Sequence, residues 1–139
     1  MTTENSIRGK KARRSGATFE LKVRADLEKQ GWILDKWTNN VDLEERKVIK
    51  AKRKYNPFMR ALSIGTGLPD FICIKRKGKL YEIIGLEVKS RGYLDADEKK
   101  KCEILLELEI FGKILIAKKG KKNGEIVYDD FKKKYKKDS

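Results

Sequence analysis

The 139-residue sequence contains no histidine and only two cysteines and two prolines, and the first two shortages exclude several kinds of chemistry. Without histidine the chain cannot form a Ser-His-Asp or Cys-His relay, and Cys73 and Cys102 alone cannot build a Cys/His zinc site. Two widely separated cysteines are more typical of buried thiols in a reducing compartment than of a disulfide framework. Any catalysis must therefore use carboxylates, lysines, hydroxyls or a hard cation held by oxygen atoms.

A long apolar run is also missing. No segment approaches the roughly 18 apolar residues that a membrane-spanning helix needs, and the N-terminal residues lack the apolar core of a secretory signal. We therefore expect a cytoplasmic protein without a membrane partner. Hydrophobic residues still make up 39% of the chain. This content suffices for one buried core, and the length favours a single domain.

Positive charge dominates what is present. Lys and Arg number 35 against 21 Asp and Glu, a net charge of +14, which indicates a polyanionic partner: nucleic acid first, an acidic membrane surface second. The basic residues cluster in segments 1–16, 36–60 and 118–137. Solvated lysine faces, common in thermophile proteins, are one interpretation, but three clusters of one sign with interleaved aromatic residues favour a phosphate-contacting surface. The predicted DNA contacts are Arg8, Lys10, Lys11, Arg13, Arg14, Lys50, Lys52, Arg53, Lys54, Tyr55, Arg60 and Lys99.

The order of apolar and turn segments predicts an α/β fold with the arrangement α-β-(insert)-β-β-α-β-β and a mixed central sheet flanked by helices. Residues 1–14 are predicted to form a flexible basic arm, and 15–139 a single domain with a basic insertion at about 38–66. Ser15 is expected to cap the first helix, whose apolar stripe is Phe19, Val23 and Leu27. Within the insertion, residues 41–54 fit either a charged helix or a hairpin.

The pattern is clearer after Pro69. Residues 70–75 and 80–89 read as the two strands of a hairpin. Asp95 and Glu98 have the spacing of a capping box, which predicts a helix from there to about residue 111. A strand at 113–117, an Asn-Gly turn and a short strand at 125–128 follow. Asp129 is expected to cap a terminal lysine-rich helix.

Three side chains of the predicted hairpin carry the chemistry. Glu87 and Lys89 are two apart on one strand, so they point to the same face, while Val88 points into the core with Leu86 and Ile84. Asp70 opens the partner strand, and antiparallel pairing brings it to the end of the strand that carries Glu87. An isolated Glu-x-Lys is most often an ordinary ion pair, but with Pro-Asp on the next strand and a basic chain we favour a metal site.

Two carboxylates at one point repel each other, and a divalent hard cation removes that cost. Mg²⁺ binds one or two carboxylates together with waters and phosphate oxygens, and Mn²⁺ is expected to substitute for it. The ion would polarise a scissile phosphate and acidify a water. Lys89 would then orient that water or stabilise developing negative charge. The pattern thus predicts a metal-dependent phosphodiester hydrolase that needs no histidine.

The motifs Gly67-Leu-Pro-Asp-Phe-Ile-Cys73 and Gly85-Leu-Glu-Val-Lys-Ser90 resemble those of the PD-(D/E)xK nuclease superfamily. Over nearly the whole chain the sequence is similar to archaeal Holliday-junction resolvases and to virus-type replication-repair nuclease modules. Three further segments, Arg14–Glu20, Trp37–Asn40 and Leu94–Lys99, resemble the family's opening helix, the strand end before the insertion and the turn after the core. The resemblance implies a restriction-endonuclease-like core, a DNA substrate and a homodimer.

The resemblance also implies roles for single residues. Asp70 and Glu87 match the metal-binding acids and Lys89 the catalytic lysine, with the Val88 backbone carbonyl as a further ligand. Glu20 matches a helix-borne acid that reaches the site through water or a second metal, although an exposed helical Glu is the commoner use. Ser63 corresponds to a loop hydroxyl near the scissile phosphate.

The sequence departs from the family in two places. Its segment between Trp37 and Gly65 is longer than in typical resolvases, and Glu98 and Lys99 stand where the nuclease modules often have a glutamine; whether either residue assists is open. Candidates for a dimer face are Phe111, Ile114 and Leu108, for which core packing is the commoner use.

The expected activity is Mg²⁺-dependent, structure-selective cleavage of DNA, most like that of a Holliday-junction resolvase. Alternatives are a general, nicking or branched-DNA endonuclease of the virus-type repair class, a DNA-binding protein that keeps the fold without the chemistry, and a basic accessory protein whose acids form surface ion pairs. Direct reading of bases is not indicated, so recognition of shape and phosphates is expected. The insertion at 38–66 is the predicted substrate-selecting element.

Overall fold

A five-stranded mixed sheet forms the centre of the protein. The computed structural model describes residues 3–51, 53–56, 61–64 and 67–135, and side chains for 15–51 and 67–135. The strands lie in the order β1-β6-β7-β8-β9, with β7 and β8 parallel and the other pairs antiparallel. This arrangement confirms the α/β class with a mixed central sheet flanked by helices. The strands are β1 (Ile33–Lys36), β6 (Phe71–Lys77), β7 (Leu80–Val88), β8 (Lys113–Lys119) and β9 (Ile126–Asp130).

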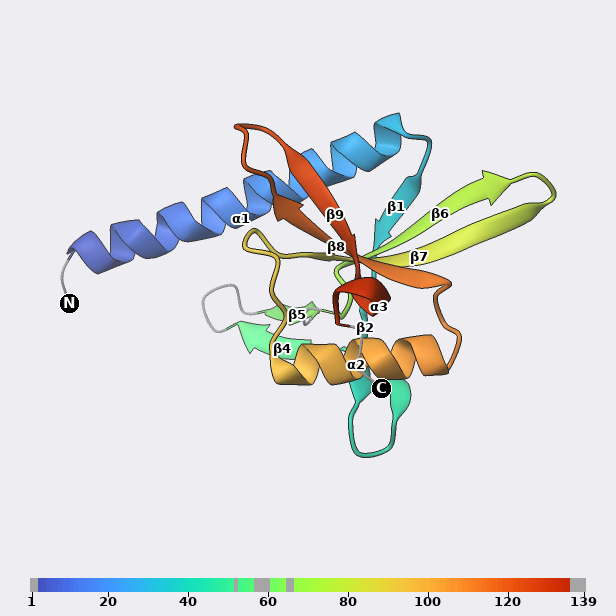
Figure 1. Cartoon of the computed structure of the whole chain (residues 1–139). Coiled ribbons are helices and arrows are strands. Elements are labelled where there is room, and N and C mark those ends of the chain that lie inside the picture. The colour runs from blue at the N-terminus through green and yellow to red at the C-terminus, as the bar shows by residue number, and fades with distance from the viewer. Residues whose placement is uncertain (1–2, 52, 57–60, 65–66, 136–139) are drawn as a thin grey trace.

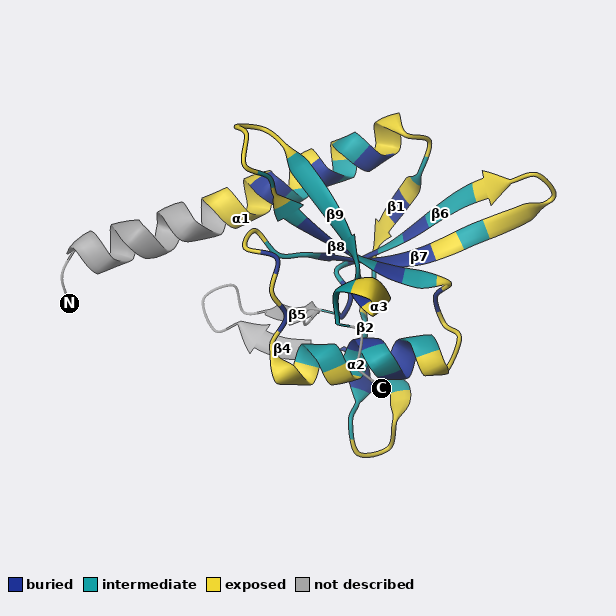
Figure 2. Cartoon of the chain, in the orientation of Figure 1, coloured by how far each residue is buried: buried dark blue, intermediate teal, exposed yellow. Residues whose placement is uncertain are grey.

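Two helices, α1 (Thr3–Lys29) and α2 (Ala96–Glu107), cover opposite faces of the sheet (Figure 1). Successive residues of β8 alternate between two apolar clusters, because neighbouring strand residues point to opposite faces. On the α1 face the predicted stripe of Phe19, Val23 and Leu27 is buried against Ile84 and Leu86. The central strands are therefore covered on both faces (Figure 2), as their apolar sequences predict.

The first helix is longer than predicted. It begins at Thr3 and runs through Ser15 and Gly16 without interruption, so the predicted start at Ser15 is wrong, and residues 3–14, which were expected as a basic arm, are helical. The segment has no proline and contains five Lys and Arg residues, which have high helix propensity. That propensity prevails over the Ser15 cap signal.

The insertion forms two small ladders, β2 (Asn39–Asp42) with β3 (Lys47–Lys50) and β4 (Arg53–Asn56) with β5 (Ala61–Ile64). The hairpin alternative is thus the correct one for residues 41–50, while residues 53 and 54 belong to the second ladder.

The Asp42 side chain explains why a helix does not form here. It accepts hydrogen bonds from the backbone N–H groups of Glu44 and Glu45 and so closes the turn. Val41 packs into the α2 cluster, and Arg46 forms an ion pair with Glu107 of α2. The first hairpin is therefore part of the scaffold around α2.

The C-terminal half follows the sequence pattern closely. The capping box of Asp95 and Glu98 is confirmed, but α2 ends at Glu107, earlier than predicted, and Phe111 turns back into the core. The short helix α3 (Phe131–Lys134) is capped by Asp130 instead of Asp129. The Asp129 carboxylate is instead engaged by two lysines, Lys118 at 2.9 Å and Lys134 at 3.0 Å.

Of the residues considered for a dimer face, Phe111 and Ile114 are buried in the core, whereas Leu108 is 46% exposed. Among the described residues, none of the helices combines the length and the apolar character that a membrane crossing needs.

Candidate metal and catalytic site

The two acids of the predicted site meet at one edge of the sheet. In the β6–β7 ladder Phe71 pairs with Leu86, so Asp70 and Glu87 are the next residues outward on adjoining strands. The backbone carbonyl of Asp70 accepts a hydrogen bond of 3.1 Å from the N–H of Trp37, directly after β1. The predicted convergence of Asp70 and Glu87 is thereby confirmed, and segments of three strands fix its position.

Close packing behind Asp70 explains how the sequence holds that position. Pro69 is fully buried and lies against Gly85 of β7. A Cβ atom at residue 85 would come within 2.8 Å of Pro69 Cγ and 3.2 Å of Phe111 Cδ2, so a larger side chain would displace the proline ring. The Gly85 position thus leaves room for Pro69, and Pro69 places Asp70 beside β7.

The Asp70 carboxylate is bound to the backbone of the neighbouring strand. Its Oδ2 accepts a hydrogen bond of 2.7 Å from the N–H of Val88. Val88 also packs its side chain into the α1 cluster with Ile84 and Leu86, as predicted. The alternation along β7 therefore directs Glu87 to the opposite face, toward α2.

Among the described side chains, Glu87 is the one charged group that is buried, with only 3% of its surface exposed. Burial, a hydrogen bond to Asp70 and the negative charge of Asp70 raise the pKa of Glu87 far above its ordinary value, while Lys89 opposes the shift and Glu98 adds to it. In the absence of a cation Glu87 is therefore protonated near neutral pH and donates to Asp70. The two acids then share one proton and one negative charge.

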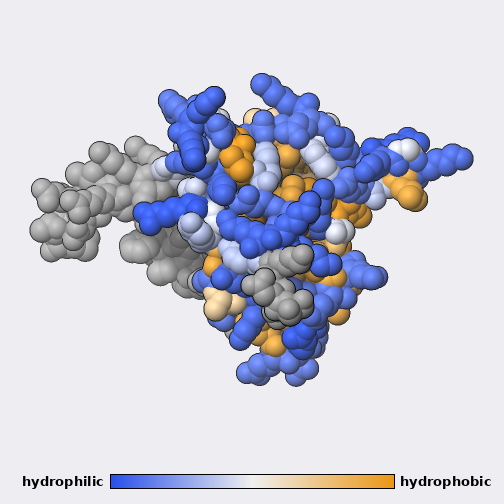
Figure 3. Space-filling view, in the orientation of Figure 1, coloured by the Kyte–Doolittle hydropathy of each residue, from blue (hydrophilic) through white to orange (hydrophobic). Residues whose placement is uncertain are grey.

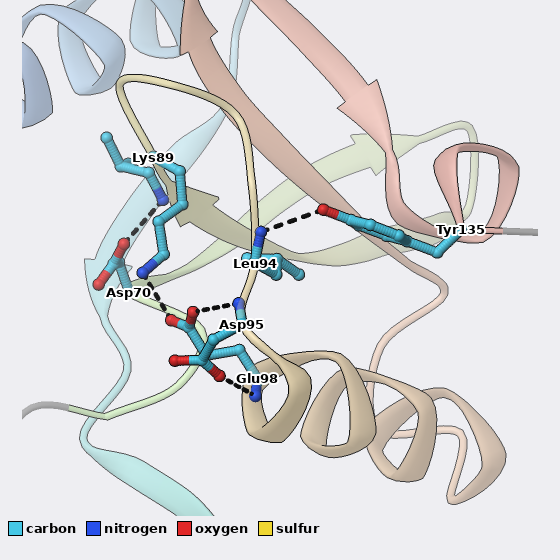
Figure 4. A network of polar contacts seen from close by, with 7 residues as sticks. Asp70, Lys89, Leu94, Asp95, Glu98 and Tyr135 are labelled. Carbon is cyan, nitrogen blue, oxygen red and sulfur yellow. Dashed lines mark hydrogen bonds and ion pairs between the residues drawn. The ribbon is translucent and has the colours of Figure 1, made fainter.

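Lys89 follows β7 and reaches the first turn of α2. Its Nζ lies 2.6 Å from Glu98 Oε2, and Figure 4 shows this contact beside Asp70. Burial lowers the pKa of Lys89, but the hydrogen bond and charge of Glu98, with the charges of Glu87 and Asp70, raise it above its ordinary value overall. Lys89 is thus held as a cation at the rim of the site.

Glu98 performs two tasks at once. Its Oε1 accepts a 3.0 Å hydrogen bond from the backbone N–H of Asp95, and Asp95 Oδ1 accepts a 2.8 Å bond from the N–H of Glu98. This capping box orients the carboxylate whose other oxygen binds Lys89 (Figure 4). The sequence indicates the cap, but its link to Lys89 depends on how α2 packs against the sheet, which the local pattern does not encode.

Glu20 approaches the same site from α1. Burial and the negative charge of Asp70 raise the pKa of the Glu20 carboxyl, and Lys36 partly offsets the shift. The predicted neighbourhood of Glu20 and Asp70 is therefore present. Within the described ranges, however, no three acidic or cysteine side chains come close enough together to enclose a metal ion. Glu20 is thus close enough to Asp70 for their charges to interact.

The oxygen ligands available here suit a hard cation that takes only some of its ligands from the protein. Asp70 and Glu87 supply carboxylate oxygens, and Mg²⁺ commonly takes one or two such ligands with water and phosphate completing its shell. Ionising Glu87 beside Asp70 costs free energy, and a bound dication would offset that cost. The residues present therefore fit Mg²⁺ or Mn²⁺, with ligands still to be provided by water or substrate.

Other predicted site residues lie elsewhere. Lys99 is 4.6 Å from the ring of Tyr135, whose hydroxyl accepts a hydrogen bond from Leu94 N–H, and Lys50 is exposed at the end of β3. Ser63 is on β5, but its side chain is outside the described residues, as are Lys52 and Arg60 altogether. The same holds for the side chains of Arg8, Lys10, Lys11, Arg13, Arg14, Arg53, Lys54 and Tyr55.

Comparison with known proteins gives no match: no family model fits the sequence, and no curated protein or solved structure is significantly similar to it. The functional argument therefore depends on the residues and geometry described above.

Proposed function

We propose that the protein is a divalent-metal-dependent endodeoxyribonuclease with a restriction-endonuclease-like core of the PD-(D/E)xK type. The observation that carries this proposal is the convergence of Asp70 and Glu87 at one sheet edge, with Lys89 as a cation at its rim. A purely structural pair of acids would be an unfavourable use of a buried position, because burying an ionisable group without compensation is costly. Selection for a ligand explains why two acids stand where apolar residues would stabilise the fold.

The roles follow from the contacts. Asp70 and Glu87 would hold Mg²⁺, with Glu87 losing its proton when the cation binds, and Asp70 is kept in place by Val88 N–H. When bound there, Mg²⁺ supplies a Lewis acid for the scissile phosphate and lowers the pKa of water. Lys89, held protonated by Glu98, orients the attacking water or stabilises the negative charge that develops on the phosphate.

The polyanion that fits a net charge of +14 is nucleic acid. We propose branched DNA as the substrate, cleaved in the manner of a Holliday-junction resolvase, because the resemblance of the sequence motifs points there. Recognition would use the phosphate backbone and the shape of the branch. A resolvase of this kind acts as a symmetric dimer, so paired cuts are expected.

A cleavage panel at low salt with Mg²⁺ tests the proposal. The substrates are duplex, nicked, flap, fork and four-way DNA, single-stranded DNA and RNA. Paired symmetric nicks in four-way junctions are expected from the parent protein and are expected to be absent from Asp70→Asn and Lys89→Met. Cleavage of nicked or forked DNA alone would place the protein in the repair-nuclease class. DNA binding without cleavage in Mg²⁺ or Mn²⁺ would refute the nuclease.

A further inference from the structure

Four lysines beside the candidate site differ from most of their neighbours in having no acidic partner. Lys119, Lys121 and Lys122 lie in or next to the loop between β8 and β9, and Lys22 lies on α1; we call these four residues the β8–β9 lysine cluster. Among the ion pairs of the described residues none involves this cluster, whereas Lys118 and Lys134 share Asp129, and Lys89 pairs with Glu98. The cluster thus keeps a net positive charge, although Glu125 lies in the same loop.

The cluster surrounds a hollow between the loop and α1. Phe19, Lys22 and loop residues 119–126 line a cavity of about 350 Å³. Lys119 Nζ lies over the Phe19 ring, 5.6 Å from the ring centre, so this ammonium group is held beside the hollow. Hydrophilic side chains gather at the upper left of Figure 3, where Figure 1 places the tip of the β8–β9 hairpin over α1.

The main chain connects this hollow directly to the candidate site. The backbone N–H of Lys89 donates to the carbonyl of Ala117, and the N–H of Lys119 donates to the carbonyl of Ser90. Because β7 and β8 are parallel, their C-terminal ends emerge at the same sheet edge. In space, the loop that carries Lys121 and Lys122 therefore begins close to Lys89, at a separation of about 10 Å. This separation corresponds to about three base pairs of duplex DNA.

We propose that the β8–β9 lysine cluster binds the phosphate backbone of the DNA substrate on the α1 side of the candidate site. This inference rests on the proposed function, because that function makes DNA the polyanion. The loop from Lys119 to Glu125 has no apolar residue, whereas segments that bind membrane surfaces combine lysines with Trp, Phe or Leu side chains that insert into the lipid. The composition of the loop therefore favours DNA over an anionic membrane.

The test measures DNA binding without cleavage. Anisotropy of a labelled duplex and a labelled four-way junction is recorded in EDTA between about 50 and 200 mM KCl for the parent, K121A/K122A and K77A/K79A. The last variant is the matched control: it removes two lysines from the exposed β6–β7 turn, at the far end of β7 and roughly 30 Å from Val88. Thermal unfolding of each variant verifies its fold.

Each lost phosphate contact lowers the slope of log K against log salt by about 0.9. We expect K121A/K122A to lose roughly 1.8 from that slope and at least about tenfold in affinity at 0.1 M salt, and K77A/K79A to keep the parent values. Equal losses in both variants, or no loss in K121A/K122A, would overturn the inference. The inference would also be overturned if K121A/K122A lost binding to phosphatidylglycerol vesicles but kept its binding to DNA. That result would assign the cluster to a membrane.

The outcomes separate this inference from the proposed function. If the parent binds DNA through the cluster but never cleaves it with Mg²⁺, the nuclease is refuted and the binding surface remains. If the parent cleaves and K121A/K122A binds and cleaves with parental affinity and rate, the surface is refuted and the nuclease remains.

Discussion

Replacing Glu87 by Gln tests the electrostatics of the site in the absence of any metal. Glu87 is buried beside Asp70, and burial with the neighbouring carboxyl raises its pKa far above the ordinary 4.5. An amide at this position donates a hydrogen bond to Asp70 as the protonated acid does, but it has no proton to gain on folding. We therefore expect Glu87→Gln to stabilise the metal-free protein.

The magnitude follows from proton linkage. A group whose pKa is raised by folding contributes its full stability below the unfolded-state pKa and loses it as the pH rises toward the folded-state pKa. Above 4.5 the parent therefore loses about 1.36 kcal/mol per pH unit relative to Glu87→Gln. At roughly pH 7 the difference reaches about 3 kcal/mol as an upper value, equivalent to about 10 °C in Tm.

Urea unfolding in EDTA at several pH values between about 4.5 and 7.5 measures this difference. Glu45→Gln serves as the control, because it removes the same charge from an exposed turn residue. The stability gain of Glu87→Gln should grow with pH and that of Glu45→Gln should stay near zero. A difference between parent and Glu87→Gln that is constant over this range would refute the shifted ionisation and the shared proton.

Three further variants probe the surroundings of the site. Glu98→Gln keeps an oxygen for the capping box but removes the charge that raises the pKa of Lys89. The alkaline limb of the pH–rate profile of DNA cleavage should therefore move to lower pH. An unmoved limb would contradict the role of Glu98. Gly85→Ala forces a Cβ against Pro69 and should cost about 1–3 kcal/mol in urea unfolding. Asp95→Ala removes the side-chain cap of α2 and should lower the Tm while leaving the pKa of Lys89, measured by NMR titration, above its ordinary value.

The core of the fold and the centre of the site were predictable because they depend on local patterns. The stripe of Phe19, Val23 and Leu27 and the capping box of Asp95 and Glu98 are periodic or short-range signals, and both are present. The convergence of Asp70 and Glu87 needs only one hairpin turn and the period of two along a strand.

The remaining features depend on tertiary structure or on competition between signals. The helix α1 starts before Ser15 because the helix propensity of the preceding residues prevails over the cap signal of Ser15. The Lys89–Glu98 ion pair joins a strand end to a helix start, and only the packing of α2 on the sheet brings them together.

Titration calorimetry with Mn²⁺ tests the central claim most directly, because it measures the cation site apart from any DNA substrate. The parent should bind Mn²⁺ at the Asp70–Glu87 site and release a proton from Glu87, so that the measured heat depends on the ionisation enthalpy of the buffer and the affinity rises with pH. Asp70→Asn and Glu87→Gln should abolish this binding, while Glu45→Gln should leave it unchanged. Parental heats in both Asp70→Asn and Glu87→Gln would contradict a metal site at this edge of the sheet.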